Sequence, residues 1–135
     1  MEEKTKSTGM VVIDSSVFID FLREYPPAVE FFKEISQQDT NHILFSAITE
    51  TELLAGKSCN NALVRDKVIY MLNSLVKINV NNPLVLIAGD ICRKYDLDLP
   101  DSVIAATALL HKATLLTRNV NDFKKVVALN VQSPY

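Results

Sequence analysis

The sequence contains no tryptophan, and only 7% of its 135 residues are aromatic. Proteins that bind single strands by stacking bases usually display several aromatic side chains, so the composition does not favour a stacking surface. An excess of positive charge is also missing, because 16 acidic and 14 basic residues give a net charge of −2. A module that holds nucleic acid by charge alone is usually basic. These absences favour an enzyme over a simple nucleic-acid-binding module.

Cysteines and long apolar runs are scarce as well. Cys59 and Cys92 lie too far apart for a CxxC pair or a zinc-site spacing, and free thiols fit the reducing cytoplasm, where we expect the protein. No apolar run approaches the roughly 20 residues that a membrane span needs, so we expect no membrane association. Residues 1–9 are polar and carry no signal-peptide core. We expect a disordered extension over residues 1–9 and a single domain over residues 10–135.

Short apolar runs alternate with amphipathic segments along the rest of the chain. Strands are predicted at residues 10–13, 42–45, 76–80 and 114–117, with a possible last strand at 129–131. Helices are predicted after Ser15, at residues 26–37, 48–55, 60–75, 82–94 and 100–111, and as a turn at 122–125. This alternation predicts an α/β fold of three layers, α/β/α, around a mostly parallel sheet of four to five strands.

Three local features are predicted from single residues. Ser15 and Ser16 can cap the first helix, and Asn82 before Pro83 is typical of a helix N-cap. The helix over residues 60–75 is predicted to place one stripe at helical spacing, formed by Leu63, the stem of Lys67, Tyr70 or Met71, and Leu75.

Acidic residues stand where ligands of a parallel α/β sheet bind. Asp14 ends the first strand, which places it at the carboxyl edge of the sheet, although an aspartate there can also be a helix N-cap. Asp101 shares a helical stripe with Ile104, Ala105 and Ala108, so it should face inward. Helix-dipole stabilisation could explain Asp101, but a buried carboxylate is costly unless it is paired or ligates a cation.

A third acid has to be chosen between Glu50 and Glu52. Two residues along a helix are about 200° apart, so both side chains cannot face the same site. Glu52 lies close in sequence to the small Ala55 and Gly56, which allow close approach to the sheet. We therefore assign Glu52 to the site and expect Glu50 to point to solvent.

Three segments together resemble the PIN-domain toxins usually called VapC: VVIDSSVFID (residues 11–20), SAITETELLAG (46–56) and LPDSVIAATALLHKATLLTRNVNDF (99–123). The resemblance implies a PIN-like domain in which Asp14, Glu52 and Asp101 form one catalytic and metal-binding site. It implies an endoribonuclease that uses Mg²⁺ or Mn²⁺, hydrolyses tRNA, rRNA or mRNA and leaves a 5′-phosphate and a 3′-hydroxyl. It also implies a small VapB-like antitoxin as partner, and a homodimer.

The third segment departs from the family at its fourth acidic position, which falls on Asn119, with Asp122 three residues later. Both are less certain metal ligands, since an amide adds no charge and Asp122 could instead cap the following turn. Ser16 matches the family's hydroxyl beside the first aspartate, or it is an N-cap. Arg118, in the TRN segment, is the best candidate for a phosphate contact. His42 and His111 are assigned structural roles.

Clustered carboxylates repel one another unless a cation intervenes, and oxygen ligands select magnesium or manganese. The sequence therefore predicts metal-assisted hydrolysis of RNA by Asp14, Glu52 and Asp101. Two alternatives stay open: a non-catalytic RNA-binding PIN domain, and a DNA-directed metal nuclease of the same fold. A phosphoacceptor receiver domain fails, because it needs adjacent acids where Ser15 and Ser16 follow Asp14.

Overall fold

A computed structural model describes residues 9–135 of the chain. Except for Gly9, the predicted disordered extension lies outside the described residues. Five parallel strands form one sheet in the order β3-β2-β1-β4-β5. They are β1 (Val11–Ile13), β2 (Ile43–Ser46), β3 (Val76–Ile78), β4 (Thr114–Leu116) and β5 (Val131–Gln132). The prediction of an α/β fold with a largely parallel sheet is confirmed.

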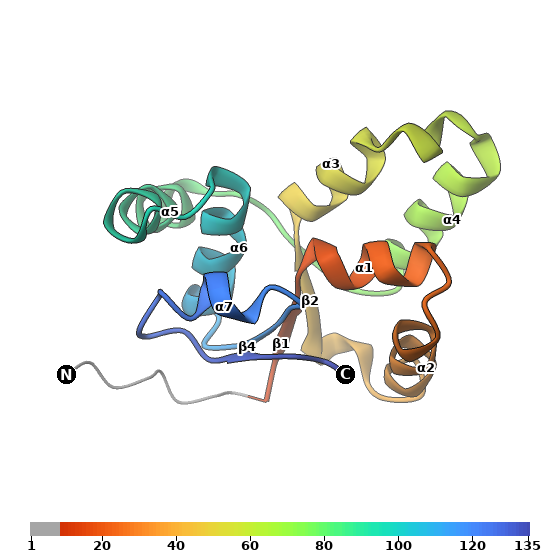
Figure 1. Ribbon diagram of the computed structural model, residues 1–135, viewed down its shortest axis with the longest axis horizontal. Helices are drawn as coiled ribbons and strands as arrows, with labels where there is room; N and C mark the ends of the chain where they lie inside the picture. The colour runs from red at the N-terminus through yellow and green to blue at the C-terminus, as the bar shows by residue number, and fades with distance from the viewer. Residues whose placement is uncertain (1–8) are drawn as a thin grey trace.

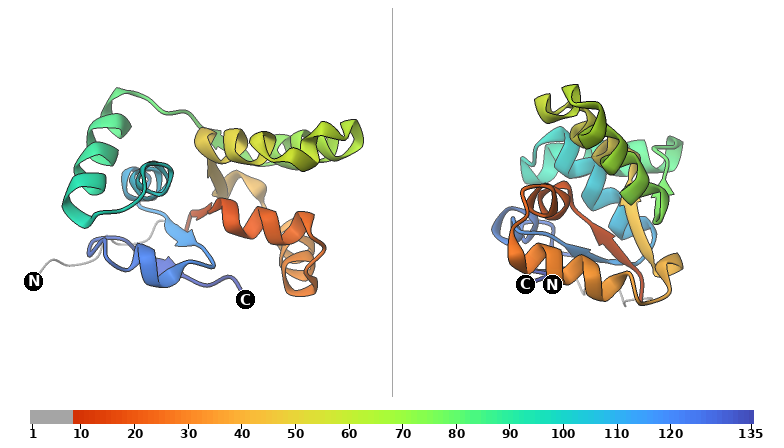
Figure 2. Two further views of the ribbon diagram at one scale, coloured as in Figure 1. Left: turned by 45° about the horizontal axis from the view of Figure 1, so that its top comes forward. Right: turned by 90° about the vertical axis from the view of Figure 1, so that its right-hand side faces the viewer.

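Helices cover both faces of this sheet (Figures 1 and 2). They are α1 (Ser15–Leu22), α2 (Pro26–Ile35), α3 (Ala47–Ala55), α4 (Ala62–Asn73), α5 (Asn82–Tyr95), α6 (Leu99–Leu110) and α7 (Val120–Phe123). Two short 3-10 helices, η1 (Thr40–His42) and η2 (Lys57–Asn60), precede β2 and α4. Among the described residues, none of these helices is long and apolar enough to cross a membrane.

Each face of the sheet has its own core, because successive side chains of a strand point to opposite faces. Val12, Leu44 and Leu115 pack with residues of α5, α6 and α7 on one face. Ile13, Phe45 and their neighbours pack with α1, α2 and α4 on the other. Strands buried on both faces read as continuous apolar runs, which is why the sequence shows them so clearly.

Two predicted helix caps are wrong by one residue. Asp14, not a serine, holds the N-cap position of α1 and makes no side-chain capping bond, and Ser15 and Ser16 are already helical. At α5 the N-cap is Asn81, whose side chain accepts a hydrogen bond from the Leu84 N–H. Asparagine precedes Pro83 twice in succession, so the cap could be assigned to either residue from sequence. Pro83 occupies an early helical position, as expected.

The predicted stripe of α4 does not coincide with the fully buried side of this helix. Val68 and Leu72 are its buried residues, whereas Leu63 and Tyr70 are 80% and 82% exposed. Lys67, Tyr70, Met71 and Leu75 line a surface cavity between α4 and α2, and Met71 and Leu75 also pack against the core of that face. Helical spacing identifies stripes but not which one meets the sheet, because a stripe facing a cavity has the same periodicity.

Candidate active site at the carboxyl edge of the sheet

β1 lies at the centre of the sheet, with β2 and β3 on one side and β4 and β5 on the other. The order in which strands are added to the sheet therefore reverses at β1. Open α/β sheets bind ligands at such a switch point, beyond the carboxyl ends of the strands. Asp14 follows β1 and Thr117 follows β4, and the Asp14 N–H donates to the Leu116 carbonyl over 2.9 Å. This backbone bond places the ends of the two strands side by side.

The side chain of Asp14 is buried, with 3% exposure of the residue, and two hydroxyls hold it. Ser16 Oγ and Thr117 Oγ1 donate to the same oxygen, Oδ2, over 2.7 and 2.8 Å. The hydroxyls themselves accept backbone N–H groups: Arg118 donates to Ser16 over 3.2 Å and Asn119 to Thr117 over 2.9 Å. Asp14 is therefore fixed to the loop between β4 and α7, and Oδ1 takes part in neither hydroxyl bond.

A second hydroxyl pair holds Glu52, which lies on α3. Ser15 Oγ donates to Glu52 Oε1 over 2.7 Å and lies 3.1 Å from Thr49 Oγ1. Since a hydroxyl has only one proton, the Thr49 hydroxyl is the donor to Ser15 while Ser15 serves Glu52. Ser15 and Thr49 are 5% and 0% exposed, so a buried pair of hydroxyls fixes the orientation of the exposed Glu52 carboxylate. Glu50 instead pairs with Lys77 at 3.1 Å, so the expectation that Glu50 points to solvent is replaced by an ion pair.

Asp101 lies in the first turn of α6, and its helix buries Ile104, Ala105 and Ala108 completely. Partial burial raises the pKa of Asp101 from 3.8 to about 6, and the charge of Asp14 is the next largest cause. The negative charges of Asp98, Glu52 and Asp122 raise the pKa further. Four carboxylates thus lie close enough to act on Asp101, and together with it they are here called the acid edge: Asp14, Glu52, Asp98, Asp101 and Asp122.

The remaining predicted site residues surround the acid edge. Asn119 is exposed at the N-cap position of α7, with no side-chain capping bond. Asp122 lies within α7 rather than before it, so it does not cap this helix. Arg118 has its backbone beside Ser16, but its guanidinium Nη1 is paired with Asp20 Oδ2 at 2.6 Å. His111 places Nδ1 2.9 Å from the Thr107 carbonyl at the end of α6, which agrees with a structural role.

Sequence reasoning missed four residues of the site: Ser15, Thr49, Asp98 and Thr117. Ser15 donates to Glu52 across 37 positions and Thr117 donates to Asp14 across 103, while Thr49 bonds Ser15 across 34. No local sequence pattern indicates such contacts. Thr117 carried a weak signal, because it directly follows a buried strand on the same edge as Asp14. Asp98 was hidden by its position, since an aspartate before Pro100 reads as an ordinary helix start.

The acids of this edge do not converge as a ready-made metal site. Within residues 9–135, no three His, Cys, Asp or Glu side chains form a ready group for a metal ion. The charges of Asp14 and Glu52 act on Asp101, but the three side chains do not converge on one point as the ligands of a metal ion would. Their assignment as a ligand set therefore stays a prediction. Mutual repulsion between carboxylates keeps such side chains apart until a cation offsets it.

Comparisons with known proteins identify the family of the chain. The model of the PIN domain family matches residues 11–129. Ribonuclease VapC19 of Mycobacterium tuberculosis is 32% identical over 135 residues, covering 93% of this chain and 100% of that protein. A solved toxin-antitoxin complex from Klebsiella pneumoniae contains a chain with a TM-score of 0.76 at 25% identity, covering 93% of this chain and 98% of its own. A DNA-bound VapBC from Salmonella typhimurium has a TM-score of 0.83 at 19% identity, with coverages of 93% and 98%.

The chain therefore belongs to the PIN domain family. The matched segment contains the first four strands, and β5 begins two residues after its end. The acid edge lies wholly inside the matched segment.

Proposed function

We propose that this chain is a divalent-metal-dependent endoribonuclease and the toxin of a VapBC-type toxin–antitoxin pair, acting in the cytoplasm. The observation that carries the proposal is the acid edge, where burial and, after it, the charges of four other carboxylates raise the pKa of Asp101 to about 6. A fold gains nothing in stability from gathering like charges. A cation that bound among them would turn this repulsion into attraction.

The residues present fit magnesium or manganese in their chemistry. The candidate ligands Asp14, Glu52 and Asp101 offer only oxygen donors, and Asn119 and Asp122 add one amide and one carboxylate nearby. Oxygen donors without histidine or cysteine favour hard cations over zinc. Hydroxyls hold Asp14 through Oδ2 and Glu52 through Oε1. The other oxygen of each carboxylate takes no part in these bonds and could ligate a cation.

When bound, such an ion would polarise the scissile phosphodiester and favour in-line attack by water. The chain's own residues supply the frame for this chemistry. Ser16 and Thr117 fix Asp14, and Ser15 with Thr49 fixes Glu52. Asp101 retains a proton up to about pH 6 without a cation. Neither His42 nor His111 is needed as a base.

RNA is favoured over DNA by one relative, because the protein that is 32% identical over nearly the whole chain is named a ribonuclease. The chemistry at the acid edge does not itself require a ribose 2′-hydroxyl. A non-catalytic RNA-binding role is disfavoured because Asp14, Glu52 and Asp101 are all retained at one edge. One experiment distinguishes both alternatives from the proposed function.

The test is cleavage by partner-free protein of total RNA, tRNA and single-stranded DNA, with magnesium, manganese or chelator. Asp101→Asn should lower the cleavage rate by at least about 100-fold, since it removes a charge that offsets the bound cation. Asp90→Asn is the matched control, because Asp90 lies on the surface of α5 in an ion pair with Arg93. The products should carry a 5′-phosphate and a 3′-hydroxyl, which result when water attacks the phosphorus and the 3′-oxygen leaves.

Each other outcome has a definite meaning. Cyclic-phosphate products would overturn the mechanism, because they arise from attack by the ribose hydroxyl. Cleavage of DNA alone would favour the DNA-directed nuclease. A folded protein that binds RNA and magnesium but does not cleave would favour the binding module, and Asn119→Asp would then test whether the missing fourth acid is the cause.

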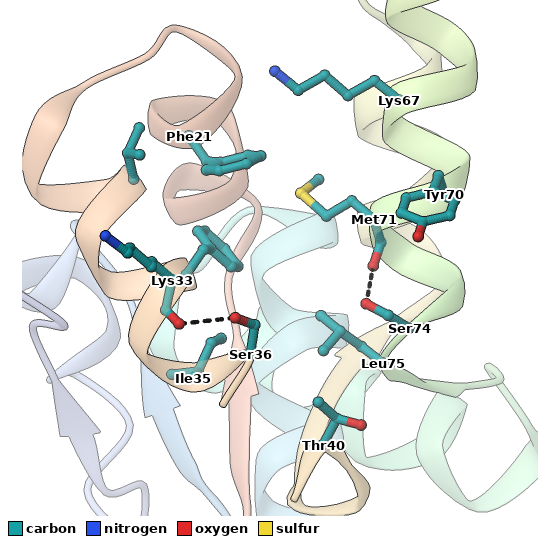
Figure 3. Close-up of a pocket in the computed structure, with 12 residues that line it drawn as sticks. Phe21, Lys33, Ile35, Ser36, Thr40, Lys67, Tyr70, Met71, Ser74 and Leu75 are labelled. Carbon is teal, nitrogen blue, oxygen red and sulfur yellow. Dashed lines mark hydrogen bonds between the residues drawn. The ribbon is translucent and has the colours of Figure 1, made fainter. Parts of the chain in front are cut away.

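A VapB-like antitoxin is the proposed partner, and an apolar cavity offers it a seat. The cavity has a volume of about 560 Å³ and lies between α1, α2 and α4 (Figure 3). Phe21, Phe32, Met71 and Leu75 form much of its wall, Lys33 also lines it, and the amine of Lys67 lies 5.2 Å from the Phe21 ring centroid. An amphipathic segment with acidic side chains would suit this lining.

The proposed antitoxin is supported by the solved relative at 25% identity, which is a toxin-antitoxin complex. Co-expression with a candidate antitoxin should give a complex on size-exclusion chromatography in which RNA cleavage is inhibited. The same measurement on the chain alone tests the proposed homodimer by its molar mass.

A further inference from the structure

Arg118 lies between β4 and α7, and its backbone belongs to the frame of the acid edge. Its N–H donates to Ser16 Oγ over 3.2 Å, and Ser16 donates to Asp14 over 2.7 Å. Two hydrogen bonds that share the Ser16 hydroxyl therefore link the backbone of Arg118 to Asp14 of the acid edge. What its long side chain does from this fixed base depends on other parts of the chain.

Three residues from two distant parts of the chain hold the guanidinium, and we call them the Arg118 clamp: Asp20 in α1, Tyr25 before α2, and Tyr135 after β5. Asp20 Oδ2 lies 2.6 Å from Arg118 Nη1 and also accepts the Tyr135 hydroxyl over 2.8 Å. The guanidinium carbon lies 5.2 Å from the Tyr25 ring centroid and 5.0 Å from that of Tyr135. Figures 1 and 2 show the end of the chain beside α1 and α2.

The clamp is itself braced. The two tyrosine rings meet edge-on at 5.9 Å, and Phe31 of α2 packs edge-on against Tyr135 at 6.0 Å. A hydrogen bond with Tyr135 and the charge of Asp20 raise the pKa of Arg118. Burial together with the hydrogen bond to Asp20 raises the pKa of Tyr135 to about 12. The hydroxyl therefore stays protonated and continues to donate to Asp20.

These contacts would add little as stabilising devices alone. The Arg118 and Asp20 side chains are 38% and 23% exposed, and ion pairs so exposed contribute about 0–1 kcal/mol. Their geometric effect is larger, because a planar guanidinium stacked on rings keeps one orientation. Arginine has five N–H donors, so the pair with Asp20 leaves others directed elsewhere on an accessible side chain.

An acidic site that acts on RNA must bring a polyanion to a place where carboxylates repel it. A positive charge at a fixed position beside the acids reduces this cost and orients the strand. We propose that Asp20, Tyr25 and Tyr135 are positioning residues that hold the Arg118 guanidinium at the rim of the acid edge, where it binds an RNA phosphate neighbouring the scissile one. This inference rests on the proposed function and extends it to four residues.

The test separates binding from cleavage. Fluorescently labelled tRNA and single-stranded RNA are titrated in chelator, and KM and kcat are measured separately with magnesium. Asp20→Asn and Tyr135→Phe should each weaken RNA binding and raise KM by about three- to tenfold, as expected for one lost hydrogen bond, with kcat little changed. Arg118→Gln should also reduce the slope of log K against log salt by about one. Arg65→Gln is the matched control on the exposed surface of α4.

A double-mutant cycle distinguishes positioning from general stability. Asp20→Asn should have no further effect on RNA binding when Arg118 is already Gln, because it acts only through the guanidinium. Unchanged KM and RNA affinity in Tyr135→Phe and Asp20→Asn would overturn the inference, and so would tighter binding, which would mean that the clamp withholds Arg118. Wild-type protein that binds RNA without cleaving it contradicts the proposed function alone. Wild-type protein that binds no RNA contradicts both.

Discussion

The acid edge and the apolar cavity lie at opposite ends of α1 and are built by opposite means. At the start of α1, Ser15 and Ser16 each bond a carboxylate whose partners come from other elements. At its end, Phe21 lines a cavity to which the flexible side chains of Met71 and Lys67 also contribute. Hydrogen bonds fix direction, whereas methionine and lysine adapt to what covers them. One helix thus joins a site suited to fixed chemistry to a site suited to an adaptable partner.

The largest effect should come from placing a charge in the cavity. Met71→Glu should weaken binding of the apolar anionic dye anilinonaphthalene sulfonate by about tenfold or more, because a carboxylate must be desolvated beside it. Fluorescence titration measures the affinity, and Leu63→Glu on the same helix is the control, since Leu63 is 80% exposed and does not line the cavity. RNA cleavage should stay unchanged in Met71→Glu. Equal dye binding in both variants would show that the cavity is not the apolar site.

An effect of about the same size, here on the cleavage rate, is expected from removing one hydroxyl at the acid edge. Thr117→Val keeps the shape of the side chain but deletes the bond to Asp14 and the acceptor of the Asn119 N–H. We expect a loss of about 1–3 kcal/mol in the free energy of unfolding and a fall in cleavage rate of about 10- to 100-fold. Urea unfolding and single-turnover cleavage measure the two quantities.

The control for Thr117→Val is Thr107→Val. Thr107 is equally buried, but its hydroxyl bonds only to the Val103 carbonyl within α6. It should lose some stability and keep full activity. If both variants lost activity in proportion to their stability, the hydroxyl of Thr117 would have no special role at the acid edge.

The smallest effect concerns the pH dependence of stability without metal. The pKa of Asp101 is raised from 3.8 to about 6, so the folded state holds this proton more tightly than the unfolded chain. The contribution is therefore most favourable below about pH 4 and is lost as the pH rises through about 6. After allowance for solvent screening of a half-buried group, the loss should be about 1 kcal/mol. Urea unfolding in chelator at about pH 4 and pH 7 measures it.

Asp101→Asn should remove this part of the pH dependence and be the more stable protein at about pH 7. Asp90→Asn should behave as wild type, because its carboxylate is exposed. Identical pH dependence in wild type and Asp101→Asn would show that the acids do not repel one another at this edge. Adding magnesium should reduce the difference between the two proteins if the ion binds there.

The sequence could predict the parts of the molecule that depend on local patterns. The doubly buried strands, the placement of Asp14 after β1 and the inward stripe of Asp101 each follow from periodicity within a few residues. The separation of Glu50 from Glu52 followed from helix geometry alone, and the structure directs Glu50 to Lys77 and Glu52 to Ser15. The resemblance to a family then united these acids at one edge.

The parts that could not be predicted depend on contacts between distant segments. Thr117 meets Asp14 across 103 positions and Tyr135 meets Asp20 across 115, and neither pair has a local signature. The side of α4 that meets the sheet could not be identified, because Met71 and Leu75 have the spacing of a core stripe and also line a cavity. The exchange of Asn81 for Asn82 as cap is a smaller error of the same kind, since two identical residues offer the same side chain.

The hydrogen bond between Thr117 and Asp14 also has a consequence for how the protein comes into being. During translation Asp14 is made 103 residues before Thr117, which completes its surroundings. At about 5–20 residues per second, synthesis of that stretch takes about 5 to 20 seconds. During this time the growing polypeptide carries Asp14, and then Glu52, without the strand β4 that leads to Thr117. The acid edge can therefore be assembled only after β4 has been made.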